Sequence, residues 1–411
     1  MSDPAARRPP RMTWHEARWA AFAAASALAI DTVPLATAVG RTLASDVLSL
    51  IDVPHYASAA MDGWAVAGTP PWRVLDPGSE AHPTSQAALD RGTAVLIVTG
   101  GLVPEGATGV LQSEFAHVDG GVLTVAAVPG AREPSALKHV RPAGEESRAG
   151  EVVVRAGATL TPPRVAVIAA SGHDEVPVVR EPRVALVLTG DEVVEAGIPA
   201  PGRVRDSFGV QLPAVVGMLG ATLDGAVRVL DDRDAVVAAI GAAARADVVV
   251  TTGGTGTSAA DHIRGALLEL GATIVVERVA MRPGSPSLLA TLPDGRLVVG
   301  LPGNPLAAMM GVLTLLEPVI ASLLGRATPP LGAVELAADV AATPAASRPT
   351  RLVPYVLSRE ESAARSGAVA TPWTGSAMLR GLAEAAGVLV IPPDGAARGE
   401  TVEVLRLPWT A

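Results

Sequence analysis

Apolar residues recur at helical spacing near the start of the chain. Trp14, Ala17 and Ala21 fall on one face of such a helix, and the pattern predicts helical structure over residues 12–45. The apolar run Trp19–Ile30 predicts a buried helix and is too short to cross a bilayer. We expect no apolar stretch of the chain to reach membrane-spanning length.

The next part of the chain has a strand-like pattern. Short apolar runs such as Ala94–Val98 and Val122–Val128 are separated by glycine and proline, which predicts a small β-rich module over residues 54–138. Residues 140–182 return to a short strand and a helix. We expect this segment to pack on the N-terminal helix.

Between residues 183 and 324, β-branched apolar runs alternate with helical patterns. This alternation predicts a doubly wound α/β domain, a parallel sheet with helices on both faces. The predicted strands are Val184–Leu188, Ala226–Leu230, Asp247–Thr251, Thr273–Arg278 and Arg296–Val299. The loops that follow them cover residues 189–192, 231–232, 252–256, 282–286 and 302–305. Ligands of open α/β sheets bind at the carboxyl ends of the strands, so we expect these loops to gather on one edge.

The last 80 or so residues, from Gly332 on, have short strands interrupted by proline and glycine, which predicts a separate β-rich domain. The chain therefore reads as multidomain α/β with β-rich modules. The expected domains are a helical and linker domain (12–53 with 139–182), an inserted β-rich domain (54–138), an α/β domain (183–326) and a C-terminal β-domain (327–411).

Composition narrows the chemistry. The chain has no cysteine, which excludes disulfides, zinc–thiolate sites and thiol nucleophiles. Its formal charge of −9 argues against coating nucleic acid, which requires a basic face. No cleavable apolar core follows the N-terminal arginines, so we expect a cytoplasmic protein without a membrane partner. Carboxylates, hydroxyls, arginines and backbone amides remain to carry the chemistry.

The loop at residues 252–261 is rich in glycine. Gly253, Gly254 and Gly256 allow backbone amides to approach an anion closely, ahead of a helix that begins near Ala259. The spacing is neither a dinucleotide fingerprint nor a Walker loop. Asp261 fits equally well as a ligand-binding residue and as part of a helix capping box.

Two acidic pairs, Asp191-Glu192 and Asp231-Asp232, follow predicted strands. Magnesium is usually held by one or two carboxylates together with ligand phosphates, so the pairs suggest a metal–phosphate site. For Asp232 alone, helix capping is the favoured interpretation.

Two further motifs have a structural explanation. Asn304 and Pro305 fit the cap and first position of an apolar helix over residues 306–320, and only their place at the strand ends makes Asn304 a functional candidate. Asp62-Gly63 fits a turn that enters a strand.

Taken in order, these segments resemble the MoeA and gephyrin E-domain family over nearly the whole chain. The motifs are Ser58-Ala-Ala-Met-Asp-Gly-Trp64, Ile97-Val-Thr-Gly100, Pro104-Glu-Gly106, Val140-Arg-Pro-Ala-Gly-Glu-Glu146, Thr189-Gly-Asp-Glu192, Arg205-Asp-Ser207, Thr252-Gly-Gly254, Pro302-Gly-Asn-Pro305 and Gly375-Ser376. The resemblance implies a homodimer of four-domain subunits with a MogA-like pterin-binding domain. The resemblance also implies an active-site cleft between the pterin-binding domain of one subunit and the β-rich module of the other.

The resemblance also implies an activity, the insertion of molybdate into adenylylated molybdopterin with release of AMP and the assistance of Mg²⁺. It implies catalytic roles for Asp62, Glu192 and Asp261, and metal binding by Asp231 and Asp232. An adenylyltransferase is a further possible partner. The implied substrate-binding residues are Thr99, Glu146, Thr189, Gly190, Asp206, Ser207, Gly253, Gly254, Gly256, Arg282, Ser285, Pro302, Gly303, Asn304 and Ser376.

Two segments depart from the family pattern. Arg282-Pro-Gly-Ser-Pro286 stands where the family usually has Lys-Pro-Gly-Lys-Pro, so Ser285 supplies a neutral hydroxyl in place of a cation. Arg264 and Arg282 are the nearest candidates to compensate. Thr251-Thr-Gly-Gly-Thr-Gly256 is similar to MogA-type adenylyltransferases. An adenylyltransferase-like paralogue and a non-catalytic pterin-binding scaffold therefore stand as alternative functions.

Overall fold

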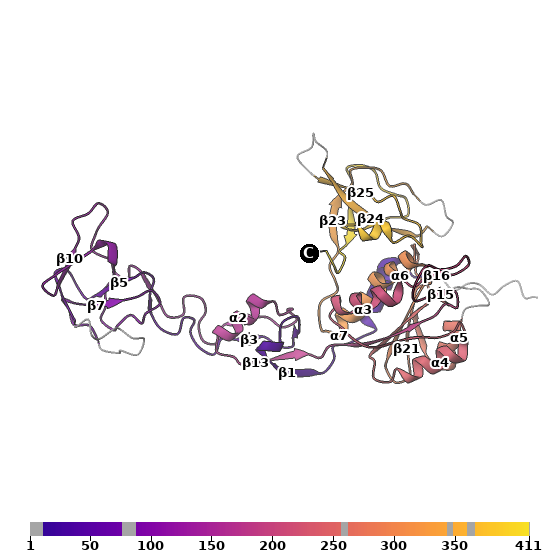
Figure 1. Cartoon of the computed structure of the whole chain (residues 1–411), viewed down its shortest axis with the longest axis horizontal. Coiled ribbons are helices and arrows are strands. Elements are labelled where there is room, and N and C mark those ends of the chain that lie inside the picture. Colours follow the sequence, from indigo (N-terminus) through magenta and orange to yellow (C-terminus); the bar gives the residue numbers. More distant parts are fainter. Residues whose placement is uncertain (1–10, 76–87, 256–261, 343–347, 360–365, 411) are drawn as a thin grey trace, which may run out of the picture. The chain divides into compact units, whose positions relative to one another are not determined.

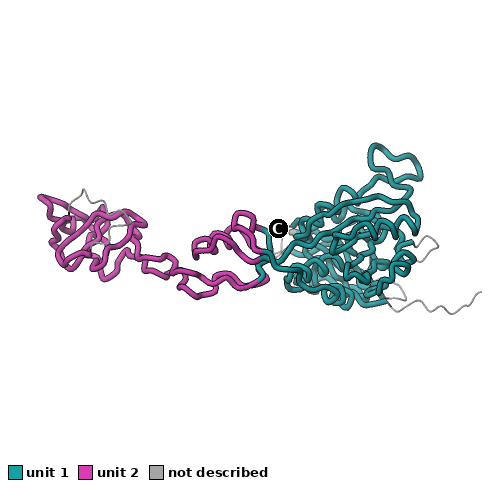
Figure 2. The backbone as a smooth tube through the Cα atoms, turned by 90° about the horizontal axis from the view of Figure 1, so that it is seen from below, with its two compact units in different colours: residues 1–31, 40–44, 178–411 teal, residues 32–39, 45–177 magenta. Residues whose placement is uncertain are grey.

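The computed structural model describes residues 11–75, 88–255, 262–342, 348–359 and 366–410. The chain forms two compact units (Figure 2). One contains residues 1–31, 40–44 and 178–411, and the other contains residues 32–39 and 45–177. We call them the α/β unit and the β-rich unit. The finer division into four domains stays a prediction.

A six-stranded sheet forms the centre of the α/β unit. Its order is β17-β14-β18-β22-β21-β19. The bounds are β14 (Arg183–Leu188), β17 (Thr222–Arg228), β18 (Val248–Thr252), β19 (Thr273–Val276), β21 (Leu288–Thr291) and β22 (Leu297–Leu301). β17, β14, β18 and β22 run parallel, which confirms most of the predicted parallel sheet.

The expectation of a wholly parallel sheet is wrong at β21. This strand was not predicted, and it runs antiparallel to both β22 and β19. The turn at Pro293-Asp294-Gly295 joins β21 directly to β22, and a connection this short is compatible only with antiparallel neighbours.

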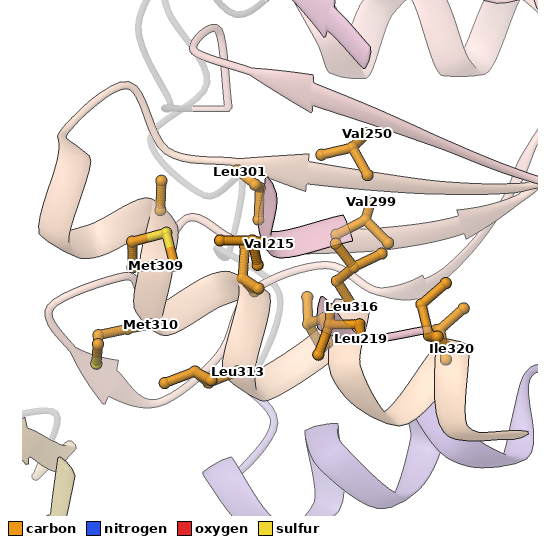
Figure 3. Packing of buried hydrophobic residues seen from close by; sticks show 14 of the residues in the cluster. Val215, Leu219, Val250, Val299, Leu301, Met309, Met310, Leu313, Leu316 and Ile320 are labelled. Carbon is orange, nitrogen blue, oxygen red and sulfur yellow. The ribbon is translucent and has the colours of Figure 1, made fainter. Parts of the chain in front are cut away.

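Helices cover both faces of the sheet (Figure 1). Alternate residues of β14 point to opposite sides, so Leu186 joins one apolar cluster and Val187 the other. The helices are α1 (Trp14–Ala23), α3 (Phe208–Met218), α4 (Arg233–Ala242), α5 (His262–Glu269), α6 (Pro305–Gly311), a π-helical segment (Val312–Leu316) and α7 (Glu317–Leu323). The larger cluster packs Val250 and Val299 of the strands against Leu316 (Figure 3).

The helix that begins at Trp14 is much shorter than predicted. It ends at Ala23, and β1 (Ile30–Pro34) and β2 (Thr42–Leu43) follow within the range that was expected to be helical. β-Branched residues and Pro34 favour an extended chain there. Trp19 and Ile30 are 68% and 62% exposed, so the prediction of a buried helix over this run is wrong.

The N-terminal helix packs on the apolar helix of the α/β unit. Trp14, Ala17 and Ala21 are fully buried in the larger cluster, next to the π-helical segment and α7. Trp14 Nε1 donates a hydrogen bond to Thr314 Oγ1 at 3.0 Å. The later segment that was expected to pack here places β13 (Glu175–Val179) between β1 and β2, within the range that was expected to be helical.

Among the residues that the structure describes, one helical run, Pro305–Leu323, is long and apolar enough to cross a membrane, contrary to the sequence-based expectation. Its mean hydropathy is 1.9 over a stretch that is 94% buried within the protein. The apolar surface of this run is therefore buried in the protein core, as is usual for a helix that is hydrophobic on all sides.

The β-rich unit contains a second six-stranded sheet, which confirms the predicted β-rich module. Its order is β8-β5-β7-β6-β10-β9. The bounds are β5 (Gly63–Val66), β6 (Trp72–Val74), β7 (Thr93–Ile97), β8 (Gly109–Gln112), β9 (Ala116–Asp119) and β10 (Val122–Val125).

Shorter elements complete this part of the chain. β4 (Ser58–Ala59) pairs with β11 (Val140–Arg141), and β3 (Val47–Leu48) pairs with β12 (Val152–Val154). They are followed by α2 (Pro162–Ala170) and β13 (Glu175–Val179), which lies between β1 and β2.

The C-terminal part of the α/β unit is a sheet of order β20-β24-β26-β27-β23, with β25 beside β24 (Figure 1). The bounds are β23 (Gly332–Glu335), β24 (Thr350–Arg359), β25 (Ser366–Ala370), α8 (Arg380–Ala383), β26 (Gly387–Ile391) and β27 (Thr401–Leu405). Its edge strand β20 (Met281–Arg282) comes from the loop after β19. The sheet thereby reaches the strand ends of the α/β core.

Candidate functional site

The predicted loops do gather at the carboxyl ends of the strands. They surround a hollow of about 580 Å³, which we call the carboxylate hollow because Glu192, Asp206 and Asp231 line it. Its wall also contains the predicted residues Thr189, Gly190, Ser207, Gly253, Gly254, Pro302, Gly303 and Asn304. Arg205 is the one basic residue among the described residues of this wall.

A second hollow of about 720 Å³ adjoins the first. We call it the arginine hollow, because Arg11, Arg282 and Arg351 line it and none of the described residues in its wall carries a carboxylate. The predicted residues Ser285 and Ser376 also line it. The two hollows share Pro286, Pro302 and Asn304, so they meet at the loop that precedes α6.

Arg282 and Arg351 are direct neighbours on the parallel strands β20 and β24. Like charges in this position repel each other. Burial, followed by the charge of Arg282, lowers the pKa of Arg351. One Nη atom of Arg351 donates to the carbonyl of Ala341 at 2.6 Å. An anion between the two guanidinium groups would relieve the repulsion.

The hydroxyl of Ser285 is an unsatisfied polar group at the same hollow. Its Oγ is buried and has no hydrogen-bond partner among the described residues. Buried hydroxyls are normally paired, and an exception marks a place for a ligand or a water. Ser285 carries no charge, but its unpaired hydroxyl could donate a hydrogen bond to a polar ligand.

Arg264, one of the two predicted compensating cations, is paired elsewhere. Its guanidinium contacts the carboxylate of Glu277, and it does not line the arginine hollow. The expectation that Arg264 compensates for Ser285 is therefore wrong. The free cation of that loop is Arg282, which has no ion-pair partner among the described residues.

Thr189 and Gly253, in the wall of the carboxylate hollow, pack closely against each other. Thr189 Oγ1 donates to the carbonyl of Thr252 at 2.5 Å. Gly253 has φ +78°, and a Cβ there would lie 2.7 Å from Thr189 Oγ1, so only glycine fits. From the sequence, Gly253 was expected to let a ligand approach the backbone. The structure shows that a glycine is also needed there because Thr189 leaves no room for a side chain.

Asp206 has a structural role at the start of α3. It accepts hydrogen bonds from the N–H groups of Phe208 and Gly209 at 2.9 and 3.0 Å, and from Arg228 at 2.6 Å. Burial would raise the pKa of Asp206, but the donors Gly209, Arg228 and Phe208 together lower it. Asp206 thus stays ionised and caps the helix, while the Ser207 side chain makes no capping hydrogen bond.

Asp191 and Asp231 tie two loops together. Each backbone N–H donates to the carboxylate of the other residue at 3.2 Å. Asp232 accepts from the N–H of Ala235 at 2.9 Å and caps α4, as the capping interpretation predicted. Asp232 is absent from the described wall of the hollow, so its assignment as a metal ligand is replaced by this structural role.

The described residues include no group of three or more Asp, Glu or His side chains arranged to hold a metal ion. A metal in the carboxylate hollow would therefore need ligands from a bound substrate. Glu192 is exposed there, and Asp231 uses only one carboxylate oxygen in a hydrogen bond with a described residue. These two residues fit the sparse protein ligation that Mg²⁺ accepts beside phosphates.

Two of the three predicted residues in the β-rich unit, Asp62 and Thr99, lie in direct contact. Asp62 Oδ1 accepts hydrogen bonds from the N–H and the hydroxyl of Thr99, at 2.6 and 2.8 Å. These bonds, the backbone one first, lower the pKa of Asp62. Glu146 is exposed and lines a separate hollow with Ser58 and Arg141. The structure thus joins Asp62 to Thr99 directly.

Gly256 and Asp261, two other predicted residues, lie outside the described residues. Sequence reasoning missed Arg351 and Arg11, which lie in no glycine-rich loop. Only the pairing of β20 with β24, and the contacts that place residue 11 beside β20, bring them to the hollow. No local signal in the sequence identifies them.

Three family models match successive parts of the chain. They are the MoeA N-terminal region (domain I and II) over residues 12–172, the probable molybdopterin binding domain over residues 185–322, and the MoeA C-terminal region (domain IV) over residues 338–407.

Known proteins agree with these matches. The chain is 34% identical to molybdopterin molybdenumtransferase 2 of Mycobacterium tuberculosis over 72% of this chain and 76% of that one. It is 34% identical to the molybdopterin molybdenumtransferase of Nostoc sp. over 72% and 70%. A crystal structure of the molybdopterin biosynthesis MoeA protein from Pyrococcus horikosii matches with a TM-score of 0.75 and 25% identity, over 97% of this chain and 99% of that one.

The fold is α/β with two adjoining hollows at the strand ends, and the named relatives are transferases, so the chain is an enzyme of the transferase class. The relatives narrow this class to one family. The chain belongs to the MoeA family of molybdenum cofactor biosynthesis.

Proposed function

We propose that the chain is a molybdopterin molybdenumtransferase, which inserts molybdate into adenylylated molybdopterin and releases AMP. The observation that carries the proposal is the separation of charge between two joined hollows. The arginine hollow suits a tetrahedral oxyanion, and the carboxylate hollow suits a phosphorylated ligand that brings a cation with it. The separation would let two anionic substrates bind next to each other, one against arginines and one with its own cation.

The arginine hollow would hold molybdate. Guanidinium groups of Arg282 and Arg351 donate to its oxygens, and the unpaired hydroxyl of Ser285 supplies a further donor. A dianion between the two arginines balances their charges. The bound oxyanion then lies beside Asn304, at the junction with the second hollow.

The carboxylate hollow would hold the adenylylated pterin, with its phosphates near Gly253 and Gly254. Glu192 and Asp231 would hold Mg²⁺ against these phosphates, and the cation supplies charge neutralisation and polarisation of phosphorus. Asp206 keeps its loop in place by capping α3. Catalytic roles for Asp62, Glu192 and Asp261, and substrate contacts by Thr99 and Glu146, belong to this proposal.

The chemistry balances without a redox partner. Two molybdenum–sulfur bonds form as one oxide of molybdate leaves as water with the two thiol protons, so molybdenum stays hexavalent. Water attacks phosphorus, the phosphorus–oxygen bond to AMP breaks, and AMP leaves. The chain's residues need only hold the two substrates together and stabilise negative charge.

We further propose that the protein is a cytoplasmic homodimer that receives its pterin substrate from an adenylyltransferase partner. This part rests on the family resemblance, which implies a cleft shared between subunits. A mixture of Asp62→Ala and Glu192→Ala subunits, each inactive alone, should then recover part of the activity in heterodimers. Recovery is not expected if each subunit contains a complete site.

The central test supplies the purified chain with adenylylated molybdopterin and molybdate. The proposal expects AMP release and a product that activates a molybdenum-free apoenzyme. The MogA-like alternative rests on the similarity of residues 251–256 to adenylyltransferases, and it instead predicts ATP consumption with unmodified molybdopterin. Retention of the pterin without metal insertion would favour the scaffold alternative and contradict the proposal.

A further inference from the structure

Arg11 reaches the arginine hollow from a segment that is anchored immediately after it. The N–H of Met12 donates to the carbonyl of Arg278 at 3.1 Å, and the carbonyl of Met12 accepts from Ala280 at 2.8 Å. Thr13 then caps α1 through a capping box with Glu16. The backbone beside Arg11 is therefore held next to the strand that carries Arg282.

The hollow contains three arginines from three separate parts of the chain. Arg282 and Arg351 are already neighbours on paired strands, and Arg11 adds a third positive charge. No ion-pair or hydrogen-bond partner of the Arg11 side chain is found among the described residues. A singly charged anion would leave this group of arginines with two uncompensated charges, and a dianion leaves one.

We propose that Arg11 selects doubly charged over singly charged tetrahedral anions in this hollow. The identity of the physiological dianion as molybdate rests on the proposed function. The Coulomb energy between a guanidinium and an anion scales with the charge of the anion, so each additional arginine favours a dianion about twice as strongly as a monoanion. Arg11 therefore contributes to charge selection as well as to affinity.

The test measures equilibrium binding of molybdate, sulfate and perchlorate to the full-length chain at low ionic strength. These tetrahedral anions differ in charge, perchlorate being the monoanion. Arg11→Gln should weaken molybdate and sulfate binding by roughly tenfold and perchlorate binding by about threefold. Arg11→Lys should keep most of the preference. Arg155→Gln, whose side chain is 81% exposed in the β-rich unit, is the matched control and should change nothing.

Equal weakening of dianions and perchlorate by Arg11→Gln, or no weakening, would overturn the inference. So would Arg11→Lys binding as poorly as Arg11→Gln, since charge would then be irrelevant. If the wild-type chain binds sulfate but not molybdate, and Arg11→Gln weakens sulfate binding more than perchlorate binding, the inference is supported while the proposed function fails. A wild-type chain that binds none of the three anions overturns both.

Discussion

The backbone carbonyl of Ser376 accepts a hydrogen bond from the N–H of Ala307 at 3.1 Å. Ala307 lies in the first turn of α6, where the side chain of Asn304 was expected to act as the cap. Asn304 makes no such bond, because the loop before α8 already supplies an acceptor to this helix end. Its amide is exposed and lines both hollows.

Asn304→Ala should therefore affect activity more than stability. We expect a change in the free energy of unfolding below about 0.5 kcal/mol, because no capping bond is lost. Asp232→Ala, which removes a side chain that does cap a helix, should cost about 0.5 to 2 kcal/mol. Urea denaturation of both variants provides the comparison. Similar losses in the two variants would contradict the different roles assigned to them.

The Asp206–Arg228 ion pair should make stability depend on pH. The folded-state pKa of Asp206 is lowered, so its contribution is fully present above the unfolded pKa and is lost as pH falls through the folded pKa. Asp206→Asn should cost about 1 to 3 kcal/mol at neutral pH, with the difference from wild type narrowing below about pH 4.

Glu195→Gln is the matched control for this pair. Glu195 contacts the same Arg228 but its side chain is 70% exposed, so its loss should change stability little. Denaturation midpoints measured from pH 3 to pH 8 give both curves. A difference between Asp206→Asn and wild type that widens on acidification would rule out this role.

Asp62→Ala should leave the fold intact and reduce metal insertion severely. The carboxylate is exposed, and its two hydrogen bonds both come from Thr99, so little packing is lost. Thr99→Val keeps the backbone donor and should have a smaller effect. Circular dichroism and AMP release are the two measurements, with Asp119→Ala as an exposed control in the same unit. An active Asp62→Ala protein would remove this residue from the site.

Ser285→Lys should strengthen molybdate binding, because it adds a cation at the hollow that already contains an unpaired hydroxyl. A charge-assisted hydrogen bond contributes about 1.5 to 3 kcal/mol, which is roughly tenfold to a hundredfold in affinity. The salt dependence of binding should steepen. Leu268→Lys places the same charge on an exposed part of α5 and should have no such effect. Unchanged or weaker binding by Ser285→Lys would remove Ser285 from the oxyanion site.

Turnover should require Mg²⁺ or Mn²⁺ and should stop in excess chelator. Asp231→Asn should raise the metal concentration needed for half-maximal activity, because Asp231 lines the carboxylate hollow. Asp232→Asn removes the same charge but preserves a capping side chain, so it should leave the metal requirement unchanged. Titration of metal against AMP release separates the two variants. Full activity in chelator would exclude the metal from the reaction.

The sequence by itself determined the alternation of strands and helices and the edge of the sheet at which the candidate loops gather. Val184–Leu188 and its neighbours are apolar runs rich in β-branched residues, so their local pattern is enough to identify buried strands. Glycine and proline mark the loops between them. Because parallel strands present their carboxyl ends on one side, the sequence pattern alone predicts that Thr189, Gly253 and Asn304 lie together.

Long-range contacts decided the rest. Arg351 lines the arginine hollow only through the pairing of β24 with β20. Asp206 becomes a cap only because Arg228 and the start of α3 donate hydrogen bonds to it. The length of the first helix was misjudged because helical spacing continues past Ala23 into residues that form strands. Charge partners, capping partners and strand register depend on residues far apart in sequence, so only the tertiary structure could assign them.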